Sequence, residues 1–184
     1  MNDLSLHIID ILQNSISAGA TVIKLKVEES EVKNLLEIVI EDNGRGMTPK
    51  EVEGLGDPFF TSRTTRRVGM GIPLFRHSAE QSGGSLDVES QLGLGTKVTA
   101  RFELNHIDRA PLGDLANSFV LTLSSYPDIA FLMEYIYNDR GYLFDSEEVK
   151  EALEGTPLYL PQVIKLLSEM ISENIEELKR ENRL

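Results

Sequence analysis

The spacing of apolar residues changes along the first 42 positions, and this change constrains the fold more than any other feature of the chain. Over residues 2–18, apolar side chains recur every three to four positions with polar ones opposite, which predicts an amphipathic helix. Residues 21–28 and 35–42 are rich in β-branched side chains and flank a polar stretch, so they predict two strands. These residues indicate a unit in which a helix packs on a sheet.

The pattern continues to residue 104. We expect a short helix at Pro49–Gly54, a helix over 72–82, and a hairpin whose strands are 85–91 and 96–104. Between Gly56 and Gly71 the sequence is rich in Gly, Thr, Ser and Arg and has no period, which predicts a mobile loop of functional length.

The remaining residues have a different organisation. Pro111 suits the first turn of a helix that runs to about Ser125. Residues 129–138 and 141–145 predict a hairpin around Asp139 and Arg140, and Ser146 begins a capping-box helix. A long amphipathic helix follows from Pro161. We therefore expect two units, 1–105 and 106–184.

Composition excludes several classes of function. The 184 residues carry a net charge of −12, which argues against general nucleic-acid binding and against an anionic membrane surface. No apolar run is long enough to cross a bilayer and the first residues are acidic, so we expect a cytoplasmic protein without a signal peptide. The absence of Cys excludes disulfides, thiolate nucleophiles and cysteine-bound metals. Acidity is concentrated after residue 104, where 15 acidic residues face seven basic ones.

Three glycine-containing motifs follow a helix that presents Asp10 and Asn14. They are Asp42-Asn43-Gly44-Arg45-Gly46-Met47, Gly69-Met70-Gly71 and Gly93-Leu94-Gly95-Thr96. Their order and spacing resemble the Bergerat-fold ATP-binding domain of the GHKL family, which includes DNA gyrase B subunits, heat-shock chaperones, histidine kinases and MutL-type proteins. The resemblance covers residues 4–104. It implies an α+β fold, a two-layer α/β sandwich with a mixed sheet, followed by a mainly helical extension with a β-hairpin.

Asp10 and Asn14 are four residues apart, so one helix face presents a carboxylate and an amide oxygen together. Asn14 could ligate Mg²⁺, an ion that prefers oxygen and is commonly shared with phosphates. Asp10 could orient or deprotonate an attacking water or hydroxyl. Taken alone, the pair is more often a solvated polar face, and the other motifs favour the functional interpretation. Family ATPases usually carry Glu at this position, so the reach of Asp10 is one methylene shorter.

The first and third glycine-containing motifs would hold the base of ATP. At the end of a strand, Asp42 can accept a hydrogen bond from the exocyclic amine of adenine, where guanine would present a carbonyl. Gly44 and Gly46 would let the backbone approach the flat base, with Met47 as an apolar contact. By family resemblance, Thr96 would help Asp42 through its hydroxyl.

The second glycine-containing motif and the loop before it would bind the phosphates. Gly69, Met70 and Gly71 lie where a helix begins and would offer N–H groups and the positive helix end to phosphate oxygens. The preceding loop looks like a lid that closes over the triphosphate. Its expected nucleotide contacts are Arg63, Thr65, Arg66 and Arg67.

Two classes of function remain open for the use of ATP. Sensor histidine kinases carry their phosphoacceptor His on a hairpin upstream of the ATP domain, and only six residues precede His7, so we expect no orthodox sensor kinase. The first class is a trans-acting protein kinase, as in the small anti-sigma-factor kinases, or a slow ATPase that regulates a partner protein. The second is a non-catalytic module whose affinity for a partner depends on ATP or ADP.

The partner is suggested only by a second resemblance. The whole chain, including residues 106–114, is similar to small bacterial ATP-binding proteins encoded beside iron-hydrogenase subunits, which implies a redox-enzyme partner. The last helix could form a homodimer seam or pack on its own chain. The residues that define its apolar face are Ile164, Leu167, Ile171, Ile175 and Leu178.

Overall fold

The computed structural model describes residues 3–55 and 70–181. Its helices are α1 (Leu4–Ser17), α2 (Pro49–Gly54), α3 (Gly71–Gln81), α4 (Leu115–Ser125), α5 (Ser146–Ala152) and α6 (Pro161–Glu181). Its strands are β1 (Val22–Ser30), β2 (Leu35–Asp42), β3 (Ser85–Gln91), β4 (Gly95–Glu103), β5 (Ala130–Tyr137) and β6 (Arg140–Asp145). None of the helices in this described part combines the length and apolar character needed to span a membrane.

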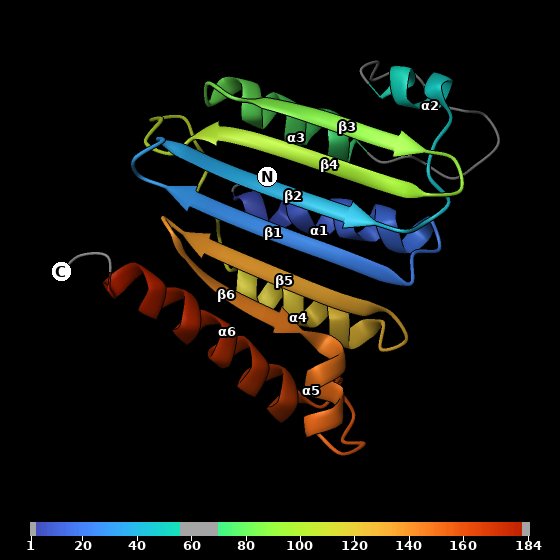
Figure 1. Ribbon diagram of the computed structural model, residues 1–184, viewed down its shortest axis with the longest axis vertical. Coiled ribbons are helices and arrows are strands. Elements are labelled where there is room, and N and C mark those ends of the chain that lie inside the picture. Colours follow the sequence, from blue (N-terminus) through green and yellow to red (C-terminus); the bar gives the residue numbers. More distant parts are fainter. Residues whose placement is uncertain (1–2, 56–69, 182–184) are drawn as a thin grey trace.

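The strands form one six-stranded mixed sheet in the order β3-β4-β2-β1-β5-β6 (Figure 1). Four of the neighbouring pairs are antiparallel, and β1 pairs with β5 in parallel, with Val22 opposite Ala130 and Glu29 opposite Tyr137. The hairpin β5–β6 therefore extends the sheet that the first 104 residues begin, and the predicted boundary at 105/106 lies in the connection between β4 and α4.

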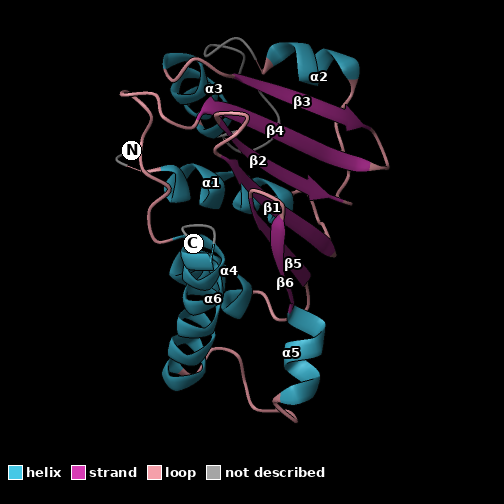
Figure 2. Cartoon of the chain, turned by 60° about the vertical axis from the view of Figure 1, so that its left-hand side comes forward, coloured by secondary structure: helices cyan, strands magenta, loops and turns pink. Residues whose placement is uncertain are grey.

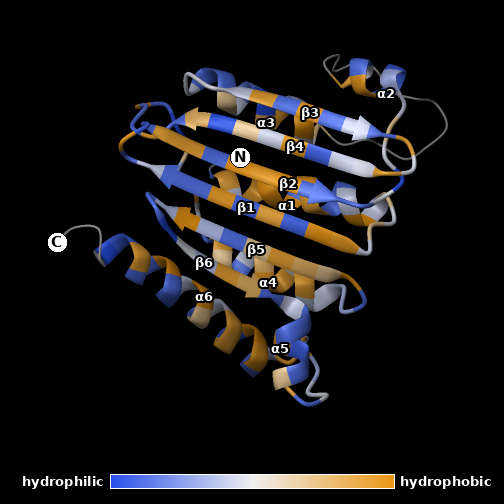
Figure 3. Ribbon diagram, viewed as in Figure 1, coloured by the Kyte–Doolittle hydropathy of each residue, from blue (hydrophilic) through white to orange (hydrophobic). Residues whose placement is uncertain are grey.

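Helices cover one face of this sheet. Figure 2 shows α1, α3, α4 and α6 on the same side, with α5 beyond the end of β6. Along β1, buried Ile23, Leu25 and Val27 alternate with more exposed Lys24 and Lys26, as expected of a strand with one covered face. Figure 3 shows the same alternation of apolar and polar residues along the central strands. The structure thus confirms the predicted two-layer α+β fold with a mixed sheet.

One predicted helix start is wrong. The helix expected from Pro111 begins at Leu115, with Asp114 as its N-cap, because Pro111 and Leu112 have another role. Their carbonyl oxygens accept hydrogen bonds from the N–H groups of Leu4 and Ser5, both at 2.9 Å, and so satisfy the free first turn of α1.

The predicted start of α5 at Ser146 is confirmed, but the cap expected there is wrong. The N-cap of α5 is Asp145, whose carboxylate accepts from the N–H of Glu147 at 2.8 Å. The Ser146 hydroxyl is buried and accepts from the N–H of Phe131 at 2.9 Å instead. The turn of the β5–β6 hairpin also lies one residue earlier than predicted, with Asn138 at φ 53°.

Helix α6 packs on its own chain. Leu167, Ile171 and Leu178 belong to the common hydrophobic core and are at most 8% exposed. Near the end of the helix, the Lys179 ammonium lies 3.0 Å from a Glu29 carboxylate oxygen and over the rings of Tyr135 and Tyr137. The apolar face of the last helix therefore packs mainly on the core of its own chain.

Candidate functional site

Asp42 ends β2 with both carboxylate oxygens engaged by neighbours on the chain. The hydroxyl of Ser15, on α1, donates to Oδ2 at 2.6 Å, and the N–H of Gly44 donates to Oδ1 at 2.8 Å. Each oxygen of an ionised carboxylate can accept a second hydrogen bond, so the group is held in one orientation with acceptor capacity left. This is the geometry that recognition of an amine donor requires.

Thr96 lies directly opposite Asp42 in the β2–β4 ladder. Its hydroxyl is 2.8 Å from that of Ser90, and the same Ser90 oxygen accepts from the N–H of Met47 at 2.8 Å. Asp42, Thr96 and Met47 are thereby brought together from three separate segments. A pocket of about 440 Å³ at these strand ends includes Asp42, Ser90 and Thr96 but does not extend to α1.

Two glycines let the loop after β2 fold back against the β3–β4 turn. Gly46 has φ 68°, and a Cβ there would lie 2.0 Å from the carbonyl oxygen of Gln91. A Cβ at Gly44 would lie 2.9 Å from Ala18, whose carbonyl accepts from the N–H of Arg45 at 2.9 Å. Side chains at these positions would push the loop away from Asp42.

Asp10 and Asn14 lie on one face of α1, and both are partly exposed. The start of α3 approaches this face, because a Cβ at Gly71 would lie 3.1 Å from the Asp10 Cβ. The N-cap of α3 is Met70, which is 65% exposed and makes no side-chain cap hydrogen bond. Within the described residues, the first N–H groups of α3 thus have no side-chain cap, and they point from the helix end that carries the positive partial charge.

Helix α1 contacts both the start of α3 and the loop after β2. Asp10 faces the start of α3, whereas Ser15 and Ala18 contact the loop after β2. At a rise of about 1.5 Å per residue, Asp10 and Ala18 are separated by about 12 Å along the helix, a span comparable to an extended nucleotide. One helix therefore relates the candidate base pocket to the candidate phosphate end.

His7 is a buried neighbour of this region. Its ring stacks on Phe75 of α3 with centroids 5.1 Å apart, and Nδ1 has no hydrogen-bond partner in the described part of the chain. Burial is the main cause that lowers the pKa of His7, so the neutral ring is favoured. The stack holds α1 against the helix that begins at Gly71.

Five of the predicted nucleotide contacts lie outside the described residues. They are Arg63, Thr65, Arg66, Arg67 and Gly69. Sequence reasoning missed Ser15 and Ser90, which orient Asp42 and connect Thr96 to Met47. Ser15 carries a usable signal, because it is a polar residue in the buried stripe of an amphipathic helix, next to Asn14.

Comparison with known proteins identifies the class. The family described as histidine kinase-, DNA gyrase B-, and HSP90-like ATPase matches residues 2–106, which is more than half of the chain. The chain therefore belongs to this ATPase family, the GHKL family that its motifs resemble. Membership supports ATP binding by this chain.

Curated relatives in this family are sensor kinases. The chain is 39% identical over 71 residues to the histidine protein kinase DivJ of Caulobacter vibrioides, which covers 36% of this chain and 12% of that protein. It is 34% identical over 105 residues to the sensor protein kinase FleS of Pseudomonas aeruginosa, covering 57% of this chain and 25% of that one. The chain thus matches a quarter or less of the length of these relatives.

A solved structure described as the N-terminal domain of a DNA repair protein has a similar fold, with a TM-score of 0.55 and 17% identity over 78% of this chain and 52% of that one. The fold is therefore shared beyond the kinases. None of the proteins named here supports the predicted association with an iron hydrogenase, which stays a prediction from the sequence.

Proposed function

We propose that this chain binds Mg-ATP between α1, α3 and the ends of β2 and β4, and that it acts on or regulates a partner protein. The observation that carries the proposal is the fixed Asp42 carboxylate, held by Ser15 and Gly44 with Thr96 across the ladder. Its remaining acceptor capacity suits the exocyclic amine of adenine and not the carbonyl of guanine. We therefore propose ATP as the nucleotide.

The residues at the other end of α1 fit the phosphates and Mg²⁺. No described residue makes a hydrogen bond to the Asn14 side-chain amide, so its oxygen is available as a ligand. The uncapped start of α3 at Met70 and Gly71 suits phosphate oxygens. Magnesium would supply charge neutralisation of the phosphates there, and we propose that the lid residues Arg63, Thr65, Arg66 and Arg67 add to it.

Asp10 is the proposed general base. Its carboxylate makes no ion pair with a described residue and lies against the start of α3, where the terminal phosphate would be. From there it would accept the proton of an attacking hydroxyl. A hydroxyl or imidazole from a partner makes the chain a trans-acting kinase, and water makes it a slow ATPase.

Nucleotide titration of Asp42→Asn tests the base pocket. We expect the wild-type chain to prefer ATP over GTP, and the variant to bind ATP about 10- to 100-fold more weakly, as for loss of a hydrogen bond to a charged group. Calorimetric titration of the full chain measures both. Equal affinity of wild type for ATP and GTP, or unchanged ATP affinity of a folded variant, would contradict the assignment of Asp42.

Phosphate release separates turnover from binding. We expect purified chain with Mg-ATP to release phosphate slowly, and Asn14→Ala to abolish the release, which also controls for contaminating ATPases. Adding labelled ATP and a candidate partner distinguishes transfer from hydrolysis. ATP binding without release or transfer would eliminate the catalytic role of Asp10.

A nucleotide-dependent binding module is the second candidate function. The observation that favours it is Asp10 itself, because its carboxylate reaches one methylene less far than the Glu of family ATPases. In that case ATP and ADP would change the affinity for a partner without chemistry. Asp10→Glu discriminates the two candidates, because a longer base should raise phosphate release in a catalyst that is limited by reach.

A further inference from the structure

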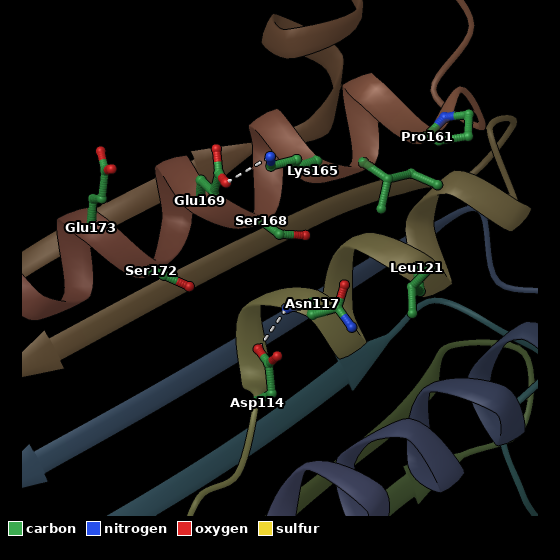
Figure 4. A pocket seen from close by; sticks show the side chains of 10 residues that line it. Asp114, Asn117, Leu121, Pro161, Lys165, Ser168, Glu169, Ser172 and Glu173 are labelled. Carbon is green, nitrogen blue, oxygen red and sulfur yellow. Dashed lines mark hydrogen bonds and ion pairs between the residues drawn. The ribbon is translucent and has the colours of Figure 1, made fainter.

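A groove runs between α4 and α6, in the part of the chain that follows the family match. Its volume is about 580 Å³, and none of the proposed nucleotide contacts lines it. Figure 4 shows side chains from both helices turned toward the groove. The groove is therefore separate from the candidate nucleotide site.

The floor of the groove is apolar and ends in small polar residues. Leu121 of α4 is 47% exposed there and lies across from Ile164 of α6. Along α6 the next groove residues are Ser168 and Ser172, whose short side chains leave the space open. The Ser168 hydroxyl has no partner among the described residues, although the equivalent groups of Thr122 and Ser125 bond to carbonyls four residues back. Because its oxygen is buried, the Ser168 hydroxyl is not offered to the groove, and only its small size matters there.

The rim of the groove is acidic. Asp114, Glu169 and Glu173 line it, and its one lysine, Lys165, lies 3.8 Å from a Glu169 oxygen. The ion pair leaves two carboxylates to set the charge of the rim. A partner with apolar side chains on one face and basic side chains beside them would complement both floor and rim.

We infer that the α4–α6 groove docks a basic amphipathic helix of a partner protein. The groove follows α6 from Pro161 to Glu173, about 18 Å at a rise of about 1.5 Å per residue, which matches a helix of about 12 residues. Docking of an apolar helix face between two helices is an established recognition mode. This inference does not depend on the proposed nucleotide chemistry.

A model peptide tests the inference on the full chain. The probe is a helical Leu/Lys peptide of about 14 residues with one leucine face, and the matched control is the same peptide with Glu for Lys. We expect the Leu/Lys peptide to bind and to shift the amide signals of α4 and α6 in two-dimensional NMR spectra. No binding, equal binding of the Leu/Glu peptide, or shifts confined to other elements would overturn the inference.

Matched variants locate the contact. Leu121→Lys on the floor should weaken binding about tenfold or more, as for loss of a central anchor, whereas Leu166→Lys, an equally apolar and 57% exposed position outside the lining, should change it less than about twofold. Glu173→Lys on the rim and Glu177→Lys outside it form a second pair. Equal effects within the pairs would overturn the inference, and so would sedimentation showing that the groove joins two copies of the chain.

Discussion

Ser15 and Asp42 show how a single hydroxyl can set the orientation of a recognition group. The hydroxyl is buried on α1 and donates to Asp42 Oδ2 at 2.6 Å, so a residue on a helix orients a carboxylate at the end of a strand. Without it, one oxygen of Asp42 loses a fixed donor and the carboxylate can rotate. In the proposed site, base recognition therefore depends on a residue that need not touch the nucleotide.

Ser15→Ala should lower both stability and affinity for ATP. We expect a loss of about 1–2 kcal/mol in the free energy of unfolding, because a buried carboxylate oxygen loses its donor, and weaker ATP binding than wild type. Urea unfolding and nucleotide titration measure the two effects. The control is Ser17→Ala, at an exposed position of the same helix, which should change neither. Unchanged ATP affinity in Ser15→Ala would remove the positioning role.

His7 should make stability depend on pH. Burial lowers its pKa below the ordinary value of 6.5, so the unfolded chain binds a proton more readily than the folded one. The stabilisation is complete above about pH 6.5 and is lost as the pH falls from there toward the lower pKa of the folded state. Urea unfolding at several pH values should show this slope.

The matched variants for this prediction are His7→Phe and His77→Gln. Phenylalanine keeps the stack on Phe75 without a titrating group, so His7→Phe should flatten the slope below pH 6.5. His77 is exposed on α3, and its replacement should leave the slope in place. A slope that persists in His7→Phe would show that other groups cause it.

At the scale of elements, the β3–β4 turn is fixed by two glycines that differ in their surroundings. Gly93 and Gly95 both have positive φ, at 83° and 125°. A Cβ at Gly95 would lie 1.9 Å from the Asp42 carbonyl oxygen, whereas a Cβ at Gly93 meets nothing within 4 Å. A side chain at Gly95 would therefore bring both backbone strain and a collision, whereas a side chain at Gly93 would bring backbone strain alone.

Gly95→Ala should therefore cost much more than Gly93→Ala. We expect about 3 kcal/mol or more in the free energy of unfolding for Gly95→Ala, with loss of ATP affinity because Asp42 must move. Gly93→Ala should cost about 1 kcal/mol and leave affinity unchanged. Thermal unfolding and ATP titration provide the comparison, and equal costs at the two positions would contradict the geometry.

Helices and strands whose bounds depend on residues close in sequence agree with the predictions from the sequence. The bounds of β2, α2 and β3 follow from alternation, from a Thr48 capping box and from flanking glycines. Pro111 and Ser146 were misassigned because each makes a hydrogen bond to a residue far away in the sequence, which no local pattern records. The parallel pairing of β1 with β5 was not predicted for the same reason.

The residues of the candidate site also include some that the sequence predicts and some that it does not. Asp42, Gly44, Gly46 and Thr96 carry motif signals, and the structure brings them to one end of the sheet. Ser90 carries no signal in the sequence, because its role arises only when the β3–β4 hairpin meets the loop before α2. The α4–α6 groove could not be predicted either, since it depends on how two helices pack.

At the scale of the whole molecule, the family match and the structural unit end at different places. The match ends at residue 106, whereas β5 adds Phe131, Met133 and Tyr135 to the common core. The carbonyls of Pro111 and Leu112 complete the first turn of α1. Residues beyond the match therefore support the helix that carries Asp10 and Asn14.

A chain truncated to residues 1–105 tests whether the predicted domain folds alone. We expect it not to adopt a native fold, because β1 would become an edge strand and α1 would lose both the carbonyl acceptors of Pro111 and Leu112 and its packing against α4. Circular dichroism and amide dispersion in NMR spectra measure this directly. Adding residues 106–184 in trans should restore dispersion. A well-dispersed, cooperatively unfolding 1–105 fragment would contradict the expectation.

The parallel pairing of β1 and β5 also determines how late in synthesis the sheet can be completed. Val22 lies opposite Ala130, so the strand nearest the middle of the sheet meets its second neighbour only after more than half of the chain has been made. Contacts that are so distant in sequence slow folding and leave a strand edge exposed in the nascent chain. The acidic second half must therefore be made before the sheet is complete, although all residues of the proposed nucleotide site are translated earlier.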